Sequence, residues 1–407
     1  MIVEADFTNS ALNPTRVWTD ISAYVGNLSC RRGRGDFFSQ IEAGSLSMSL
    51  DNRDLRFDPD NSAGPYYSLG QGVTPRRPVR VRATYGALGT KPLWQGFLDE
   101  IQAGWMFPGY GEPVATAYDF FSILAGGVVQ GPGTITADTG PVDRMNQILT
   151  LSGFSSLSVD GSLSSFSIPA VDVVDSEFGI LQNLLEVAAA DLGVLFVSAD
   201  GVLSYHTPRK RFDAVSDYTP RYVFGNLGGT DLITDENQHV FSAATITNAW
   251  TITPSGGSPQ SASDASSIDS YGRLPQTRGS VTTDAITCLS QAHYLLGRTK
   301  TPGSYIDRLT FRPSSVADGT LRDDMFAASL TLEIGDLIRH SVKPPGASYT
   351  VTKDYWVEGI EHNVSDSDWL TTLSVSPIDP TMTNGLGYWI LGDATYGLLG
   401  QSTYLAL

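Results

Sequence analysis

The stretch "SLSMSLDNRDLRFDPDN", residues 45–61, carries four aspartates that could bind a metal ion or catalyse a reaction. A calcium loop of the EF-hand type needs Asp or Asn at positions three and five, Gly at position six and Glu at position twelve. Counting from Asp51 places Arg53 and Arg56 at positions three and six. Counting from Asp58 leaves no Glu at position twelve. The stretch therefore does not fit an EF-hand loop.

Two other interpretations of this stretch remain open. A calcium site outside the EF-hand pattern could use the oxygens of residues 58–61. Alternatively, Arg53 and Arg56 pair with the neighbouring aspartates, and residues 58–61 form a turn, because Pro fixes φ and Asx side chains bond to the backbone. In this second interpretation, which we favour, Phe57 anchors the turn on the preceding strands.

The five histidines do not indicate a metal site, because none pairs with another at the HxH, HxxxH or HExxH spacing of zinc hydrolases. We expect His293, on the apolar side of a helix, to lie in a core or an interface. We expect His362, at the end of a strand, to be exposed to solvent. The full set is His206, His239, His293, His340 and His362.

Motifs for nucleophilic or acid–base catalysis are also sparse. There is no G-x-S-x-G, and Cys30 lies beside two arginines that would lower a thiol pKa but has no visible partner. Carboxylate pairs that could cleave a glycosidic bond fall at strand ends or in turns, and the chain has no spare module for a cell-wall hydrolase. We therefore expect no catalytic activity, no metal and no cofactor. The carboxylate pairs are Asp99/Glu100, Glu358/Glu361 and Asp366/Asp368.

Composition indicates a chain of several packed domains: 407 residues, 41% hydrophobic and 17% charged. The net charge of −17 argues against a general affinity for nucleic acid. Basic stretches such as "PRRPVRVR", residues 75–82, are interpreted as solvated turns or inter-subunit ion-pair partners. Two cysteines make a disulfide framework implausible. With no apolar leader and no eighteen-residue apolar run, we expect the chain to fold in a cytoplasm.

The elements fall into alternating regions. Residues 1–123 show short strands of period two, and we assign them to a first β-barrel. Residues 124–212 form an α/β module, whose strongest helix, "SEFGILQNLLEVAAADLG", has Ser176 as N-cap and Gly193 as its stop. A hairpin turns at Asp200-Gly201 in the same module.

Strand patterns return in residues 213–252 and 304–380, which we assign to a second β-barrel. Residues 253–303 form an inserted loop-helix module. It begins with a Ser/Gly-rich loop, residues 253–272, and continues with an amphipathic helix whose apolar side includes Ile286.

The two strand-rich regions share an order of motifs. In each, a strand and a Gly/Pro turn precede an aromatic-Gly-apolar strand: "WQGF" at 94–97 and "WVEGI" at 356–360. The spacing differs by one residue. We interpret the pattern as two similar barrels within one chain.

The stretch "AGSLSMSLDNRDLRFDPDN", followed by "PYY" and "PRRPVRVRA", resembles minor tail proteins of long-tailed bacteriophages, especially those of actinobacterial hosts. "IGDLI", "VEGIEH" and "WLTTLSVSP" are similar to the tail-hub, or baseplate-hub, family. The resemblance implies a mainly β fold with α/β insertions: two tail-tube-like β-barrels and two smaller α/β modules. It also implies that three copies supply six barrels to the six-fold tail tube.

The resemblance further implies a structural protein at the virion tail tip: a homotrimer that closes the tube and lets phage DNA pass without specific binding. Its partners would be a distal tail or tail tube protein, the tape measure protein and fibre or spike proteins. Alternatives are a distal tail adapter in a six-fold ring and a receptor- or carbohydrate-binding tail protein. Residues 381–407 are expected to be an interface segment. The expected interface residues are Arg53, Asp54, Arg56, Phe57, Asp58, Arg76, Arg77, Trp389, Tyr396, Leu398, Leu399 and Tyr404.

Overall fold

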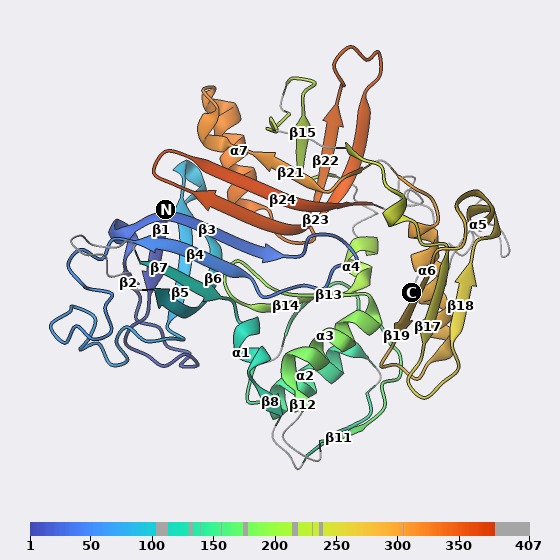
Figure 1. Ribbon diagram of the computed structural model, residues 1–407, viewed down its shortest axis with the longest axis horizontal. Helices are drawn as coiled ribbons and strands as arrows, with labels where there is room; N and C mark the ends of the chain where they lie inside the picture. Colours follow the sequence, from blue (N-terminus) through green and yellow to red (C-terminus); the bar gives the residue numbers. More distant parts are fainter. Residues whose placement is uncertain are drawn as a thin grey trace.

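The computed structural model describes residues 1–102, 113–129, 133–138, 140–155, 157–173, 178–213, 219–229, 231–235, 239–303 and 305–378. Its largest element is a twelve-stranded sheet (Figure 1). The strands follow the order β15-β22-β23-β3-β4-β7-β6-β5-β1-β2, with β24 paired to β23 and β21 to β24. Their bounds are β1 Ile2–Ala5, β2 Thr19–Asp20, β3 Val25–Gly33, β4 Ser45–Leu50, β5 Pro78–Thr84, β6 Thr90–Gln102, β7 Val114–Tyr118, β15 Tyr222–Gly225, β21 Arg308–Phe311, β22 Leu337–Val342, β23 Val351–Val364 and β24 Trp369–Pro377.

Strands β4, β5, β6 and β7 form what we call the first sheet unit, in the antiparallel order β4-β7-β6-β5. Strand β5 shows why this sequence is extended: Val79 and Val81 are fully buried on one face. On the other face, Arg80 and Arg82 bond to Glu4 of β1, at 2.7 and 2.9 Å from Nε to Oε2. The period-two alternation is confirmed, but Arg80 and Arg82 lie in a strand and pair within the chain, so they are not the solvated turn or inter-subunit partners expected of this basic stretch.

Strands β21, β22, β23 and β24 form the second sheet unit, in the antiparallel order β21-β24-β23-β22. This is the order of the first unit, so the internal repeat predicted from the sequence is present in the strand topology. The units differ in their first connection. The first unit has an irregular segment at 51–77, whereas the second has α7 (Gly319–Thr331), capped by the Asp318 side chain on the Leu321 N–H.

The fold is mixed α and β and rich in strands, but the predicted pair of closed barrels is not found among the described residues. Strand β3 pairs with β4 and also with the second half of β23, so it joins the two units into one continuous sheet. The join is close: Gly33 has φ of 90°, and a Cβ there would lie 2.3 Å from the Glu358 carbonyl oxygen. Only glycine fits this crossing.

The α/β module lies beside the sheet, with α1 (Phe121–Ala125), α2 (Pro141–Leu151) and α3 (Ile180–Asp191) packed against the predicted hairpin of β13 (Val194–Val197) and β14 (Leu203–His206). Helix α3 begins at Ile180 with Gly179 as N-cap, because Phe178 and Gly179 are extended and pair with β8. The predicted N-cap at Ser176 is therefore wrong, and Ser176 itself lies outside the described residues. The smaller elements are β8 Val128–Val129, β9 Gly133–Ile135, β10 Ser158–Asp160, β11 Val171–Val173, β12 Phe178–Gly179, α4 Pro208–Asp213, β16 His239–Val240 and β20 Tyr305–Ile306.

Residues 253–272 do not form the predicted loop. They contain the end of β17 (Ala249–Thr253), then β18 (Gln260–Ser263) and α5 (Ala265–Tyr271). With β19 (Pro275–Gly279), β17 and β18 make a separate three-stranded sheet, so β17 does not belong to the second barrel as predicted. Strand β18 is so rich in Ser that composition hides it, and pairing with β17 determines its structure.

Helix α6 (Ala285–Thr299) packs on this small sheet and buries a face that overlaps the predicted one only in part: Ala292 and Leu296 are buried as predicted, but Ile286 is not. Ile286 is 77% exposed, whereas Cys288, Ala292 and Leu295 are buried with Trp250 of β17. The described residues form four apolar cores, one for each sheet unit, one for the α/β module and one for the β17–β19 sheet with α6. In the described part of the chain, no helix combines the length and apolar character needed to span a membrane.

Candidate functional site

The acidic stretch forms a turn between β4 and β5 in which the arginines neutralise neighbouring aspartates. Arg53 Nε lies 2.9 Å from Asp51 Oδ1, and Arg56 Nε lies 3.0 Å from Asp54 Oδ1. These bonds lower the pKa of both aspartates below the ordinary value, so both are ionised. The ion-pair interpretation of this stretch is confirmed for these two pairs.

Aromatic rings hold the turn on the sheet. Phe57 is 1% exposed, and its ring lies 5.5 Å from that of Tyr66 and 6.2 Å from that of Tyr24. The Arg56 guanidinium stacks 3.5 Å from the centre of the Tyr24 ring. The Asp58 carboxylate accepts the Asp60 N–H at 2.9 Å, as an Asx turn requires. Phe57 thus anchors the turn as predicted.

The residues predicted to form an interface differ in how exposed their side chains are. Arg53 and Asp54 have side chains 76% and 53% exposed, and Arg76 is exposed as well. Three others are corrected to interior residues: Phe57 and Asp58 within the turn, and Arg77, which donates from Nη1 to the Asn9 carbonyl oxygen at 2.5 Å. A side chain that its own fold covers cannot contact a partner. The Arg56 side chain is intermediate in burial, at 17% exposed. Trp389, Tyr396, Leu398, Leu399 and Tyr404 lie outside the described residues.

The described residues give little support for a metal site or for catalysis by a histidine. Among the described residues, no three His, Cys, Asp or Glu side chains are grouped so that they could hold a metal ion. His362 is buried, not solvated as predicted, because β23 is the central strand of the second unit; burial lowers its pKa to about 3. Burial likewise lowers the pKa of His340 to about 4 and of His206 to about 3. His293 is exposed on α6, so it does not lie in a core of this chain, and its place in an interface stays a prediction.

Two further titratable groups are buried for structural reasons. Burial raises the pKa of Cys30 to about 12, which outweighs the adjacent arginines and leaves the thiol unreactive. Burial raises the pKa of Asp119 to about 7, although its carboxylate accepts the N–H groups of Gly44 and Phe121 at 2.6 and 2.9 Å. Asp119 therefore fixes the end of β7 against the start of α1.

The strongest electrostatic feature is a buried cluster around Glu358, which sequence reasoning missed. Its carboxylate accepts two bonds from Arg211, each 2.9 Å, and one from Arg34 Nε at 2.9 Å. The Ser376 hydroxyl donates a further bond. Burial raises the pKa of Glu358, but the two guanidinium groups outweigh it and hold the pKa well below its usual range. Glu358 is thus a fixed anion, not a proton donor.

Glu358 holds three parts of the chain together. Arg34 lies directly after β3, Arg211 lies in α4, and Glu358 belongs to β23. The register of β23 on β24 passes from Val357 to Gly359, so Glu358 is the extra residue of a β-bulge. This bulge accounts for the one-residue difference between the two repeated motifs.

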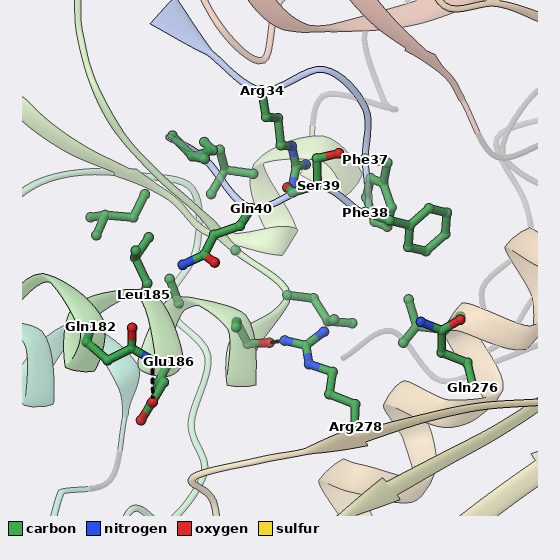
Figure 2. A pocket seen from close by; sticks show the side chains of 18 of the residues that line it. Arg34, Phe37, Phe38, Ser39, Gln40, Gln182, Leu185, Glu186, Gln276 and Arg278 are labelled. Atoms are coloured by element: carbon green, nitrogen blue, oxygen red, sulfur yellow. Dashed lines mark hydrogen bonds between the residues drawn. The ribbon is translucent and has the colours of Figure 1, made fainter. Parts of the chain in front are cut away.

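A cavity of about 400 Å³ opens beside this cluster, where the segment after β3, α3 and the β17–β19 sheet meet (Figure 2). Figure 2 shows Arg34, Gln40, Phe37 and Phe38 on one wall and Arg278 reaching in from another. Its lining combines aromatic and aliphatic side chains with amides and guanidinium groups, the composition of a ligand or peptide site.

Comparisons with known proteins agree on the fold. No family model matches the sequence, and no curated protein matches it. The 43 kDa tail protein of prophage MuSo2 from Shewanella oneidensis has a TM-score of 0.54 and 13% identity, over 94% of this chain and 98% of that chain. A tail protein from Neisseria meningitidis MC58 has a TM-score of 0.58 and 10% identity, over 93% and 96%. This chain therefore has, over nearly its whole length, the fold of solved phage tail proteins.

Proposed function

We propose that this chain is a structural protein of a bacteriophage tail, and specifically a tail hub at the tail tip. The observation that carries the proposal is the likeness to two tail proteins over more than nine-tenths of each chain. A similarity of this kind supports the fold directly and the function by analogy. The sequence resemblance to minor tail proteins and hubs points the same way.

The repeat of the two sheet units suggests how such a protein would act. Each unit presents the same strand order, so each would occupy one equivalent position around a tube. Three copies then offer six units, which adapts a six-fold tail tube to a three-fold tip. We propose a homotrimer, located at the virion tail tip and assembled in the host cytoplasm, that closes the tube.

The exposed charges of the turn between β4 and β5 are the proposed contacts with neighbouring subunits. Arg53, Asp54 and Arg76 offer both signs of charge, which favours pairing in a defined register. The proposed partners are a distal tail or tail tube protein, the tape measure protein and fibre or spike proteins. With a net charge of −17, the assembled ring would repel DNA phosphates and let DNA pass without specific binding.

Copy number tests this proposal. Light scattering during size-exclusion chromatography of the purified full chain should give three times 43.7 kDa. Cryo-electron microscopy of tails should then show one trimer at the tip. Six copies in a ring would overturn the hub assignment in favour of a distal tail adapter. Binding of the purified chain to host cell walls would favour a receptor- or carbohydrate-binding tail protein.

The proposed role is non-enzymatic. The buried carboxylate of Glu358 is held ionised by two arginines, and the pair Asp99/Glu100 is exposed on β6. A peptidoglycan zymogram with the purified full chain should therefore remain unlysed. A cleared zone that disappears with Glu358→Gln would contradict this expectation.

A further inference from the structure

The third strands of the two sheet units, β6 and β23, share a pattern of hydrogen bonds as well as a place in the strand order. In the first unit, the Arg76 N–H donates to the Leu98 carbonyl oxygen at 2.6 Å. In the second unit, the Gly335 N–H donates to the Val357 carbonyl oxygen at 2.7 Å. Arg76 and Gly335 both have positive φ, and the strand register shifts directly after Leu98 and after Val357. The end of β6 after Leu98 therefore corresponds to the part of β23 after Val357.

A strand covers this part of β23 but not the end of β6. Residues 359–364 of β23 pair antiparallel with β3, and the Arg34 N–H donates to the Glu358 carbonyl oxygen at 2.9 Å. Pairing of β5 on β6 stops before residues 99–102, which pair only with β7 among the described residues. The Glu100 side chain is exposed there. We call residues 99–102 the free end of β6.

The second unit has its own counterpart of β3. Strand β3 runs antiparallel along β4, the first strand of its unit. Strand β16 runs in the same way along β20, which leads directly into β21, the first strand of the second unit. The Asp235 N–H donates to the Thr310 carbonyl oxygen of β21 at 2.8 Å, in the same register that pairs His239 with Ile306. Strand β16 thus lies along the outer edge of the second unit as β3 lies along that of the first.

The other edge of β16 is not hydrogen-bonded to a strand in the described part of the chain. Backbone groups alternate in an antiparallel ladder, so Val240 directs its N–H and C=O away from β20 if Asp235 directs its own toward β21. Phe241, the next residue, is 70% exposed. An open strand edge beside an exposed phenylalanine is a surface that another strand would cover.

The register of the two units determines which residues would meet. Followed outward from the two bulges, it equates Arg31 of β3 with His239 of β16. Arg31 lies opposite Glu361 of β23, and the residue of β6 that corresponds to Glu361 is Gln102. A contact built like the internal one would therefore place His239 opposite Gln102.

We propose that β16 of one copy of this chain pairs antiparallel with the free end of β6 in the next copy, as β3 pairs with β23 within the chain. The internal register gives three residue pairs: His239–Gln102, Val240–Ile101 and Phe241–Glu100. The partner is a second copy because β21, β24, β23, β3, β4 and β7 lie between the two edges in one chain (Figure 1). At about 4.8 Å per strand they separate the edges by roughly 30 Å along the sheet.

This contact is head-to-tail, because the two surfaces differ. It deepens the proposed function and rests on it for the copy number: three such contacts would close a ring of six sheet units. The free end of β6 and β16 would then be the places where the sheet continues from one copy to the next.

Engineered disulfides test the register. Glu100→Cys and Phe241→Cys are combined in one chain, because residues that flank a hydrogen-bonded pair bring their Cα atoms within disulfide distance. Cys30 and Cys288 are buried and stay reduced. Under mild oxidation we expect a covalent ladder on a denaturing gel that ends at three times 43.7 kDa. Each single variant should run as one chain, and a mixture of the two should give only dimers.

The matched control combines Glu100→Cys with Phe38→Cys, because Phe38 is 56% exposed outside this surface; it should give no ladder. A trimer in solution without the ladder would overturn this inference and leave the proposed hub standing. A ladder that ends at six chains would support the strand contact and overturn the hub of three copies. A link confined to one chain mass, or dimers of the Glu100→Cys variant alone, would overturn the contact, and a chain that stays monomeric would overturn both proposals.

Loss of the exposed ring gives a second test. Phe241→Ser should weaken trimer association by about tenfold or more, because the ring is exposed in a single chain and covered in the contact. The denaturation midpoint, measured where the chain is monomeric, should not change. Phe38→Ser is the control and should leave association unchanged. Sedimentation equilibrium measures association, and equal values for Phe241→Ser and the unmodified chain would show that β16 does not form the contact.

Discussion

The two sheet units have one strand order but bury different side chains. On β4, β5, β6 and β7 the buried side chains are all apolar, such as Val81 and Trp94. On β22, β23 and β24 the buried set includes His340, Glu358 and His362. Inside its sheet the first unit buries only apolar side chains, whereas the second must satisfy buried polar groups as well.

The polar groups of the second unit lie where it meets the rest of the molecule. Glu358 binds Arg34 and Arg211 from other elements, and the His340 ring lies 5.9 Å from that of His239 of β16. In the first unit, Gln95 precedes Gly96 as Glu358 precedes Gly359, but the irregularity of β6 on β7 falls three residues later, between Leu98 and Glu100. The extra residue of the second unit is therefore a buried carboxylate that binds two other elements, whereas the extra residue of the first unit, Asp99, is exposed. The difference suggests that a duplicated unit acquired specificity through buried charge.

Removing the buried charge of Glu358 should have the largest effect on stability. Glu358→Gln leaves two buried guanidinium groups without an anion and should lower the free energy of unfolding by about 3–5 kcal/mol. Denaturant titration with fluorescence measures it. The control is Glu361→Gln on the same strand, whose carboxylate accepts a local bond from Asn363 at 2.8 Å; it should change stability by less than about 0.5 kcal/mol. Equal effects would mean that the bulge carries no special interaction.

Acid should then distinguish the two units, because only the second buries histidines. The folded-state pKa of His362 is about 3 and that of His340 about 4, both below the ordinary value of 6.5. Protonation therefore favours the unfolded chain, and stability falls as the pH drops below 6.5, by up to about 2 kcal/mol per histidine at pH 5. Hydrogen exchange, corrected for the intrinsic rate, should accelerate in β22–β24 between pH 7 and 5 but not in β4–β7. Uniform acceleration would contradict the comparison.

Much of this architecture could be predicted from the sequence because local patterns determine it. Alternation identified β5, and the motifs around Trp94 and Trp356 revealed the repeat. The bulge was visible only as a one-residue offset. The features that could not be predicted depend on residues far apart in the sequence. Glu358 binds arginines 147 and 324 residues away, and no local pattern contains them. Ser/Gly-rich composition concealed β18 for the same reason, because its pairing with β17 decides its structure.

The glycines after the two tryptophans test what the units share. A Cβ at Gly96 would lie 2.3 Å from the Tyr118 carbonyl oxygen, and one at Gly359 would lie 2.6 Å from that of Arg34. Gly96→Ala and Gly359→Ala should each lower the free energy of unfolding by about 1–3 kcal/mol, since backbone must move. Gly297→Ala in α6 is the control, because an added Cβ there would meet nothing within 4 Å; it should be neutral or stabilising. A loss at only one site would show that the close crossing belongs to one unit.

Changes in the connection between β4 and β5, whose place in the second unit is taken by α7, should have the smallest effects on stability. Arg56 stacks on Tyr24 and is 17% exposed, whereas Arg53 is 76% exposed in its pair with Asp51. Arg56→Ala should lower the free energy of unfolding by about 0.5–1 kcal/mol, because a stacked cation and its alkyl stem are lost. Arg53→Ala should leave the denaturation midpoint unchanged, because water solvates both partners. If Arg53→Ala instead weakens trimer formation without changing that midpoint, the exposed charges of the first unit serve assembly while the buried charges of the second serve folding.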